Sequence, residues 1–225
     1  MTQYELKTLC EKYSPMNHRE RMVEVFRDFD RVLVTSSFGT SSAILLHHLH
    51  KVRPEHPVHF VDTTFHFPET MAYKEKLANL YDLTVETVSP SSIENMYTKL
   101  DWTWAHKPDE CCFANKVAPM KALKATHDVW ISGMIGRTSL NRRNLDIFSF
   151  DGEVVRFYPF LDMSQEEADI YKVIYELPAH PLQSRGYDSV GCTHCTAPGK
   201  GREGRWAGKQ KTECGLHLYT HKKVG

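Results

Sequence analysis

The sequence lacks a net charge and lacks any long apolar run. Its 28 basic residues balance 28 acidic ones, and its aromatic residues are not interleaved with a basic run, which argues against a general nucleic-acid binder. No apolar stretch approaches the length of a membrane-spanning helix. The opening stretch MTQYELKTLCEKYSP carries charges where a secretion signal would be apolar. We therefore expect a cytoplasmic protein that binds neither nucleic acid nor membranes.

Cysteine is also sparse, and cytosolic thiols are kept reduced, which argues against structural disulfides. Four of the six cysteines form two close pairs and two stand alone: Cys111 with Cys112, Cys192 with Cys195, Cys10, and Cys214. A Cys-x-x-Cys pair suits a redox dithiol, half a zinc site or half an iron–sulfur site. Together the two pairs supply the four sulfurs of a [4Fe-4S] cluster. A four-cysteine zinc site is the alternative, although its cysteines are usually two to four residues apart.

The apolar pattern predicts an α/β protein with one domain and a tail. Short apolar segments alternate with segments of helical periodicity, which indicates a mostly parallel sheet flanked by helices. The predicted strands cover 31–37, 57–63, 83–88 and 128–134, followed by a hairpin over 146–160 that turns at Asp151-Gly152. The predicted helices cover 4–29, 43–52, 68–81, 113–125 and 164–176, the last beginning at a capping box on Ser164.

A turn of glycine and small hydroxyl residues, SSFGTSS, follows the first predicted strand. Such a turn exposes backbone N–H groups at the start of a helix, which suits a phosphate or sulfate, although it can equally be a plain connection. No Gly-Lys-Ser/Thr follows, so it is not a P-loop. The candidate anion ligands are Ser36, Ser37, Phe38, Gly39, Thr40 and Ser41. We expect Val61, Asp62 and Thr63, after the second strand, to line the same crevice.

The remaining thiol, Cys214, lies in the stretch KTECGLH close to several cations. Lys211 and His217 flank it, and Arg202 and Arg205 lie just upstream. Neighbouring cations lower the pKa of a thiol and make it a competent nucleophile. The residues alone leave open an inert, exposed thiol.

Four motifs, in this order, resemble those of the assimilatory adenosine 5'-phosphosulfate (APS) reductase family. They are DECCFANKVAPM (109–120), HPLQSRGYDSVGCTHCT (180–196), REGRW (202–206) and KTECGLH (211–217). SSFGTSS and VDTTFHFPET (61–70) agree with the same family. The resemblance implies an adenine-nucleotide α-hydrolase-like, Rossmann-like sheet. It implies a nucleotide-binding domain over 1–198 that holds a [4Fe-4S] cluster on its four paired cysteines, and a mobile C-terminal arm over 199–225.

The resemblance also implies a reaction. The Cys214 thiolate would attack the sulfate sulfur of APS, AMP would leave, and thioredoxin or a glutaredoxin-like reductant would release sulfite from the S-sulfocysteine. Bringing two anions together requires offsetting charge, for which we expect Lys116, Arg202 and Arg205. Lys116 lies four residues after Cys112, one helical turn on, which predicts a place beside the cluster. His217 is expected to act beside the nucleophile.

One loop departs from the family pattern. GMIGRTSLNRR (133–143) keeps Ser139 and Arg142 in register but loses the usual paired arginines, for which we expect Arg137 to substitute. All three count as expected substrate ligands.

Other functions remain open. A reductase of 3'-phosphoadenosine 5'-phosphosulfate (PAPS), or one that accepts both nucleotides, is disfavoured by the paired cysteines, which family members specific for PAPS typically lack. An ATP-dependent tRNA sulfur transferase would carry Ser-Gly-Gly-x-Asp-Ser in place of SFGTSS. A non-catalytic iron–sulfur or zinc module is the simplest alternative, and a homo-oligomer is left open.

Overall fold

The computed structural model describes residues 1–136, 142, 145–209, 211 and 213–217. Within these residues, six short strands form one sheet in the order β3-β2-β1-β4-β6-β5. Every neighbouring pair is parallel except β5 and β6, which form an antiparallel hairpin at the edge. The strands are β1 (Val32–Thr35), β2 (Val58–Val61), β3 (Val85–Val88), β4 (Val129–Ser132), β5 (Phe148–Phe150) and β6 (Val155–Phe157). The predicted α/β class with a mostly parallel sheet is confirmed.

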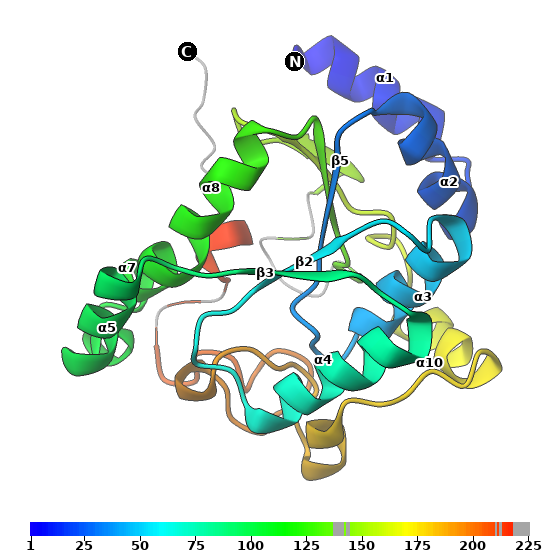
Figure 1. The fold of residues 1–225 in the computed structure, drawn as a ribbon. Helices are drawn as coiled ribbons and strands as arrows, with labels where there is room; N and C mark the ends of the chain where they lie inside the picture. The colour runs from blue at the N-terminus through cyan, green and yellow to red at the C-terminus, as the bar shows by residue number, and fades with distance from the viewer. Residues whose placement is uncertain (137–141, 143–144, 210, 212, 218–225) are drawn as a thin grey trace.

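Helices cover both faces of this sheet (Figure 1). In the first group, α2 (His18–Asp28), α4 (Pro68–Tyr81) and α10 (Gln165–Ile174) pack against α3 (Ser42–Val52), and α1 (Gln3–Tyr13) packs against β5. The second group connects β3 to β4: α5 (Ser92–Leu100), α6 (Thr103–His106), α7 (Pro108–Cys112), the π-helix η1 (Phe113–Val117) and α8 (Ala118–Ala125). Because β3 and β4 lie on opposite sides of β1, this second connection returns the chain across the sheet.

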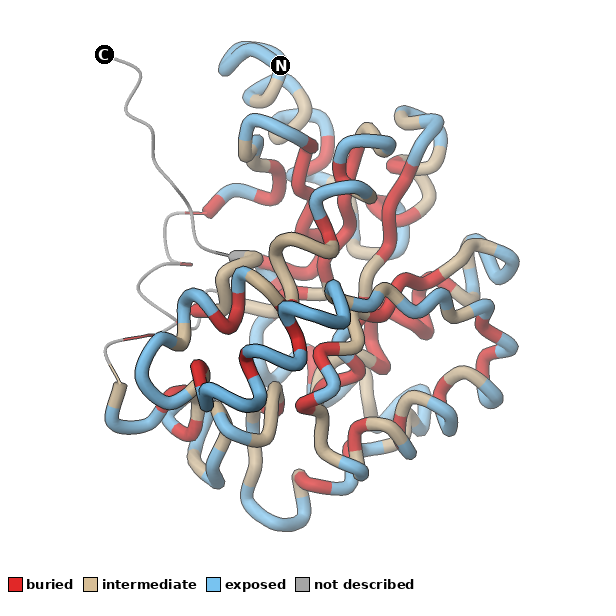
Figure 2. Tube along the Cα trace, turned by 60° about the vertical axis from the view of Figure 1, so that its left-hand side comes forward, coloured by how far each residue is buried: buried red, intermediate tan, exposed pale blue. Residues whose placement is uncertain are grey.

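Side-chain alternation along the strands divides the core between the two faces. Val32 and Val34 of β1 lie in the larger apolar cluster with α2, α3 and α4. Leu33, between them, lies in a smaller cluster with Met120 of α8 and Trp130 of β4. Successive strand residues point to opposite faces, so each strand contributes to both layers. Figure 2 shows the buried positions concentrated on the central strands and on the inner sides of the helices.

The predicted single helix over 4–29 is two helices. The first ends at Tyr13, and Pro15 follows, where a helix could not continue without losing a hydrogen bond. The second begins with a capping box, in which the Asn17 side chain accepts from the Glu20 N–H and the Glu20 carboxylate accepts from the Asn17 N–H. The capping box predicted at Ser164 is confirmed.

The helix α5 was not predicted, because its polarity is inverted. It buries Asn95 and Thr98, whereas its apolar side chains are among the most exposed in the described chain: Ile93, Met96, Tyr97 and Leu100. The buried face forms hydrogen bonds with η1: Asn95 Nδ2 donates to Asn115 Oδ1 at 2.7 Å, and Asn115 Nδ2 donates to Thr98 Oγ1 at 3.0 Å. A polar network therefore holds α5 against η1.

Beyond α10 the chain forms loops with three short 3-10 helices, η2 (Pro181–Arg185), η3 (Thr193–Cys195) and η4 (Gly215–His217). Backbone bridges tie this part to the loop after β2, between His66 and Cys192, and to itself, between Thr196 and Arg205. The Trp206 N–H donates to the Cys195 carbonyl at 3.0 Å. Residues on both sides of position 198 are thus hydrogen-bonded together, and the domain boundary there stays a prediction. Among the described residues, no helix is long and apolar enough to cross a membrane.

The predicted hairpin turn at Asp151 is anchored by buried charge. Lys124 Nζ donates to the Asp151 carboxylate at 2.7 Å, and Arg156 Nη2 donates to the same oxygen at 2.7 Å. Arg156 also lies over the Trp130 ring, 5.4 Å from its centroid. Burial favours a raised pKa for Asp151, but Lys124, the Val154 N–H and Arg156 outweigh it and hold the pKa well below its usual range.

Asp151→Asn is expected to lower the free energy of unfolding by about 2 kcal/mol, because it removes the carboxylate that Lys124 and Arg156 share and leaves Lys124 with the more exposed carboxylate of Glu153. Since the pKa of Asp151 is lowered in the folded state, its stabilisation is present above about pH 4 and is lost as the pH falls. Urea denaturation at neutral and acidic pH measures both effects. The exposed Asp30→Asn is the matched control, and equal stability of the two variants at pH 7 would contradict the expectation.

Candidate active site

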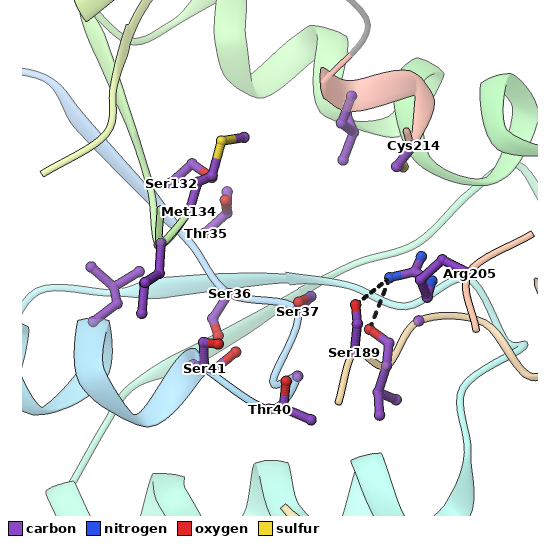
Figure 3. Close-up of a pocket in the computed structure, with 18 of the residues that line it drawn as sticks. Thr35, Ser36, Ser37, Thr40, Ser41, Ser132, Met134, Ser189, Arg205 and Cys214 are labelled. Carbon is purple, nitrogen blue, oxygen red and sulfur yellow. Dashed lines mark hydrogen bonds between the residues drawn. The ribbon is translucent and has the colours of Figure 1, made fainter. Parts of the chain in front are cut away.

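A pocket of about 300 Å³ lies at the carboxyl ends of β1 and β4. The chain runs from β1 to β2 and β3 on one side and returns to β4 on the other, so the order reverses between β1 and β4. Ligands of open α/β sheets bind at such a reversal. Figure 3 shows hydroxyl side chains of the loop after β1 on one side of the pocket and Cys214 on the other.

The loop after β1 supplies hydroxyl groups and a helix N-terminus. Ser36, Ser37, Gly39, Thr40 and Ser41 line the pocket. The helix α3 starts directly after Ser41, whose side chain makes no capping hydrogen bond. Ser41 and Ser42, at this helix start, line the pocket, and a helix N-terminus without a side-chain cap suits an anion.

Three expected ligands have side chains directed elsewhere. Phe38, at φ 48°, is fully buried and its ring lies 5.6 Å from that of Phe60. The Asp62 carboxylate accepts from the Thr64 N–H at 2.8 Å, and Thr63 is fully buried beside Cys192. None of these side chains is among the described pocket residues.

The end of β4 and the start of the expected substrate loop contribute pocket residues that the sequence analysis did not name as ligands: Ser132, Gly133, Met134 and Ile135. The strand before them adds Trp130, whose Nε1 donates to Thr35 Oγ1 at 2.7 Å. The missed signal is the strand order: the pocket lies between β1 and β4, so the residues after β4 complete it better than those after β2.

Four cations expected from the sequence line this one pocket: Lys116, Arg142, Arg202 and Arg205. They come from η1, the loop after β4 and the segment 202–205. The expected ligands Arg137 and Ser139 lie outside the described residues. The side chain of His217, the last residue of η4, lies outside what the structure describes, and its role beside the nucleophile stays a prediction.

Arg205 is held in place from several sides. Its Nη1 donates to Ser189 Oγ and to the Val190 carbonyl, each at 3.3 Å (Figure 3). Its guanidinium lies over the Trp206 ring, 4.4 Å from the centroid. A Cβ at Gly191 would lie only 2.3 Å from Arg205 Nη2, so glycine is required there for the guanidinium to occupy this position.

Cys214 reaches the pocket through a short segment, which we call the Cys214 segment and define as residues 211 and 213–217. It packs against η1, where a Cβ added to Gly215 would lie 3.0 Å from Val117 and 3.6 Å from Cys112. At its start, the Glu213 carboxylate accepts hydrogen bonds from Arg142 and Arg202. Lys211 pairs with Asp109.

The Cys214 thiol is the acidic partner of a close pair. A hydrogen bond from Cys112 holds the pKa of Cys214 well below its usual range, against the effect of burial, with further lowering by Lys116, the Leu216 N–H and Arg205. Cys112 would have no proton to donate if it ligated a metal. In a metal-loaded protein, Lys116, Arg205 and the Leu216 N–H would then be the groups that lower the pKa of Cys214. Burial favours a lower pKa for Lys116, but thiolates at Cys192, Cys214 and Cys112 outweigh it and raise the pKa.

A second, smaller cavity adjoins the first and contains all four paired cysteines, Cys111, Cys112, Cys192 and Cys195. Polar groups reach two of the sulfurs: Asn115 Nδ2 donates to Cys111 Sγ at 3.6 Å, and Thr63 Oγ1 lies 3.4 Å from Cys192 Sγ. Lys116 and Arg205 line both cavities and therefore stand on their common wall. Lys116 thus adjoins the four cysteines, although η1 is π-helical here and not the α-helical turn that the spacing suggested.

The four cysteines of this cavity supply the sulfurs that an iron–sulfur cluster would need. In the described part of the chain, no group of three or more His, Cys, Asp or Glu side chains is arranged to hold one metal ion. A zinc ion would bring four sulfurs to within ~3.8 Å of one another, whereas a four-iron cube separates its ligands more widely. Two buried donors of residues that line the cavity, Trp206 Nε1 and Arg205 Nε, have no hydrogen-bond partner within the described residues. The sulfur atoms of a bound cluster would be suitable acceptors for them.

Together, the sheet and the pocket are typical of an α/β enzyme, with a cysteine and four cations around one site. The family model of the phosphoadenosine phosphosulfate reductase domain matches residues 31–198. Two curated relatives are the phosphoadenosine 5'-phosphosulfate reductase of Gloeobacter violaceus, 35% identical over 94% of this chain and 93% of its own, and the adenosine 5'-phosphosulfate reductase of Halalkalibacterium halodurans, 34% identical over 84% and 85%. The chain belongs to the phosphoadenosine phosphosulfate reductase family.

A solved structure supports the same fold. The phosphoadenylyl-sulfate reductase of Candida auris, in its phosphate complex, superposes with a TM-score of 0.77 at 21% identity, over 88% of this chain and 98% of that one. The expected adenine-nucleotide α-hydrolase-like fold is thereby confirmed. The resemblance to the family is also confirmed, and the chain is an oxidoreductase that acts on a sulfur group.

The thiols should differ in reactivity at neutral pH. Burial raises the pKa of Cys10, whereas the pKa of Cys214 is lowered, so iodoacetamide at pH 7 should alkylate Cys214 about tenfold faster than Cys10. Lys116→Gln is expected to raise the midpoint of the Cys214 pH–rate profile by about one unit, because a nearby positive charge is lost. Lys121→Gln, exposed on α8, is the matched control. An unchanged midpoint in Lys116→Gln would contradict this account.

Proposed function

We propose that the chain reduces APS to sulfite and AMP through an S-sulfocysteine on Cys214, as a step of sulfate assimilation. One observation carries the proposal: Cys214 lines the same pocket as the hydroxyl loop and the N-terminus of α3. A nucleophilic sulfur and an anion cradle thus meet in a space of about 300 Å³, within the range of small-molecule sites.

Binding would use the two ends of the pocket differently. The loop hydroxyls and the first N–H groups of α3 are suited to the phosphate. The apolar side chains Leu45, Met134 and Ile135 line the same pocket, and they offer contact area for the adenosine. Lys116 and Arg205, on the Cys214 side, would attract the sulfate and offset the repulsion between two anions.

The chemistry that follows is a substitution at sulfur. The Cys214 thiolate attacks the sulfate sulfur, a sulfur–sulfur bond forms, and the bond from sulfur to the phosphate oxygen breaks with its electron pair leaving on AMP. A thiolate of the reductant then attacks Cys214 Sγ, and sulfite leaves with the electron pair of the sulfur–sulfur bond. The second thiol of the reductant resolves the mixed disulfide, so the reductant is oxidised by two electrons. We propose a thioredoxin-like protein for this role.

We further propose that Cys111, Cys112, Cys192 and Cys195 hold a [4Fe-4S] cluster. Support comes from their common cavity, from the donors directed at the sulfurs and from the two cations on the wall toward the pocket. When bound, the cluster would supply negative charge and a fixed field beside the sulfate. Lys116 and Arg205 would then be positioned by anions on one side and would meet the substrate on the other.

The nearest alternative is PAPS in place of APS. One relative, from Gloeobacter violaceus, carries the name of a PAPS reductase, and that from Halalkalibacterium halodurans carries the name of an APS reductase. The four cysteines in one cavity favour APS, because family members specific for PAPS typically lack them. Both nucleotides therefore belong in the tests.

Mixing the purified protein with APS and no reductant should add one SO₃ group to the chain. Peptide mapping by mass spectrometry is expected to place it on Cys214, and reduced thioredoxin should remove it and release sulfite. Cys214→Ser should abolish both the adduct and sulfite formation, because the weakly acidic hydroxyl is a poor nucleophile at pH 7.

Cys10→Ser is the matched control and should react as the wild type does. PAPS offered under the same conditions should label Cys214 more slowly than APS. Faster labelling by PAPS would reverse the nucleotide assignment, and an adduct on any other residue, or sulfite formation by Cys214→Ser, would refute the mechanism.

Protein purified without oxygen should contain about four irons and four sulfides per chain. Cys192→Ser is expected to lose most of both, because one ligand of the cluster is removed, whereas Cys10→Ser should retain them. Elemental analysis and visible absorption provide the measurement. Zinc in place of iron, with no sulfide, would favour the metal module described above.

A further inference from the structure

The residue before the nucleophile carries a buried charge. The Glu213 side chain is only 1% exposed. Arg142 Nε donates to Glu213 Oε1 at 2.8 Å and Arg142 Nη2 donates to Oε2 at 3.1 Å. Arg202 Nη2 donates to the same Oε2 at 2.9 Å. One carboxylate at the base of the Cys214 segment is thus held by two arginines from separate parts of the chain.

These ion pairs make the position of the segment depend on charge. A carboxylate is costly to bury unless it is paired and hydrogen-bonded, so the pairing with Arg142 and Arg202 favours the buried position of Glu213. The other anchor pairs the buried Lys211 with Asp109, whose carboxylate is 74% exposed, so water screens that carboxylate and weakens the pair. Glu213 is therefore the stronger attachment.

The four cations of the pocket fall into two pairs with different neighbours. Arg142 and Arg202 bind Glu213, whereas Lys116 and Arg205 lie on the wall shared with the cysteine cavity. We expected these arginines to bind the substrate. Arg142 and Arg202, however, bind the carboxylate of Glu213.

We propose that Glu213 is a positioning residue, a charge latch that holds Cys214 in the pocket through Arg142 and Arg202. Docking is needed for a nucleophile to meet a bound ligand, and undocking is needed for a protein-sized thiol to reach the same sulfur. The latch sets the balance between these two states. Its significance for catalysis rests on the proposed function, but its existence does not.

Two measurements report docking without using activity. Trypsin can cleave after Lys211 only when that buried side chain leaves its site. The limiting rate of Cys214 alkylation at high pH, where the thiol is fully ionised, reports access to the sulfur, while the midpoint of the profile reports its pKa. Glu213→Gln keeps the shape of the side chain and removes its charge, so it should raise both cleavage and the limiting rate about tenfold or more.

Matched variants separate a latch from a general loss of structure. Glu213→Asp keeps the charge and should fall between wild type and Glu213→Gln. Arg202→Gln should also release the segment, and the double variant Glu213→Gln/Arg202→Gln should be no more open than the more open single variant, because both remove the same interaction. Glu203→Gln, at an exposed neighbouring position, should behave as wild type.

The outcomes are distinct. Unchanged cleavage and limiting rate in Glu213→Gln, or additive effects in the double variant, would overturn the latch. An open segment in Glu213→Gln, combined with a wild type that never accepts SO₃ from APS or PAPS, would leave the latch in place and refute the proposed function. Where both hold, sulfonation of Cys214 in a single turnover should slow in Glu213→Gln and recover in part in Glu213→Asp.

Discussion

The structure depends on the balance of charge around the wall between its two cavities. Cys112, Cys192 and Cys214 act electrostatically on Lys116, and the same lysine lines the pocket in which an anion would bind. An ammonium group so enclosed keeps its charge only because anions are close to it on more than one side. Arg205 shares this wall and is held by Trp206, Ser189 and the space left at Gly191. Two separated parts of the chain must therefore fold together before either cavity has its electrostatic character.

Much of this arrangement could be predicted from the sequence. The periodicity of the strands and the turn at Asp151 predicted the sheet and its edge hairpin, because local patterns determine these elements. Spacing among the cysteines indicated a common site, although the convergence of Cys112 and Cys192 in space was an inference from chemistry and resemblance. Cys214 drew attention through its charged neighbours. In each case the signal lay within a few residues of the feature that it predicted.

What could not be predicted depends on contacts between distant segments. The inverted polarity of α5 makes sense only once Asn95 meets Asn115 across the interface with η1. The residues after β4 line the pocket because β4 lies beside β1, which no local pattern in either strand reveals. Glu213 reads as an ordinary tail residue until Arg142, 71 positions away, donates to it.

The π-helical winding of η1 has a consequence for how this protein can vary. The Ala118 N–H donates to the Phe113 carbonyl, five residues back, so the chain turns less per residue here than in an α-helix. Cys112 and Lys116 owe their relative direction to that looser winding. Side chains in this stretch can change while the geometry survives, but its length is fixed: a residue gained or lost would rotate one of the two away from the other. The spacing between them is thus a tighter constraint on divergence than the identity of the residues that fill it.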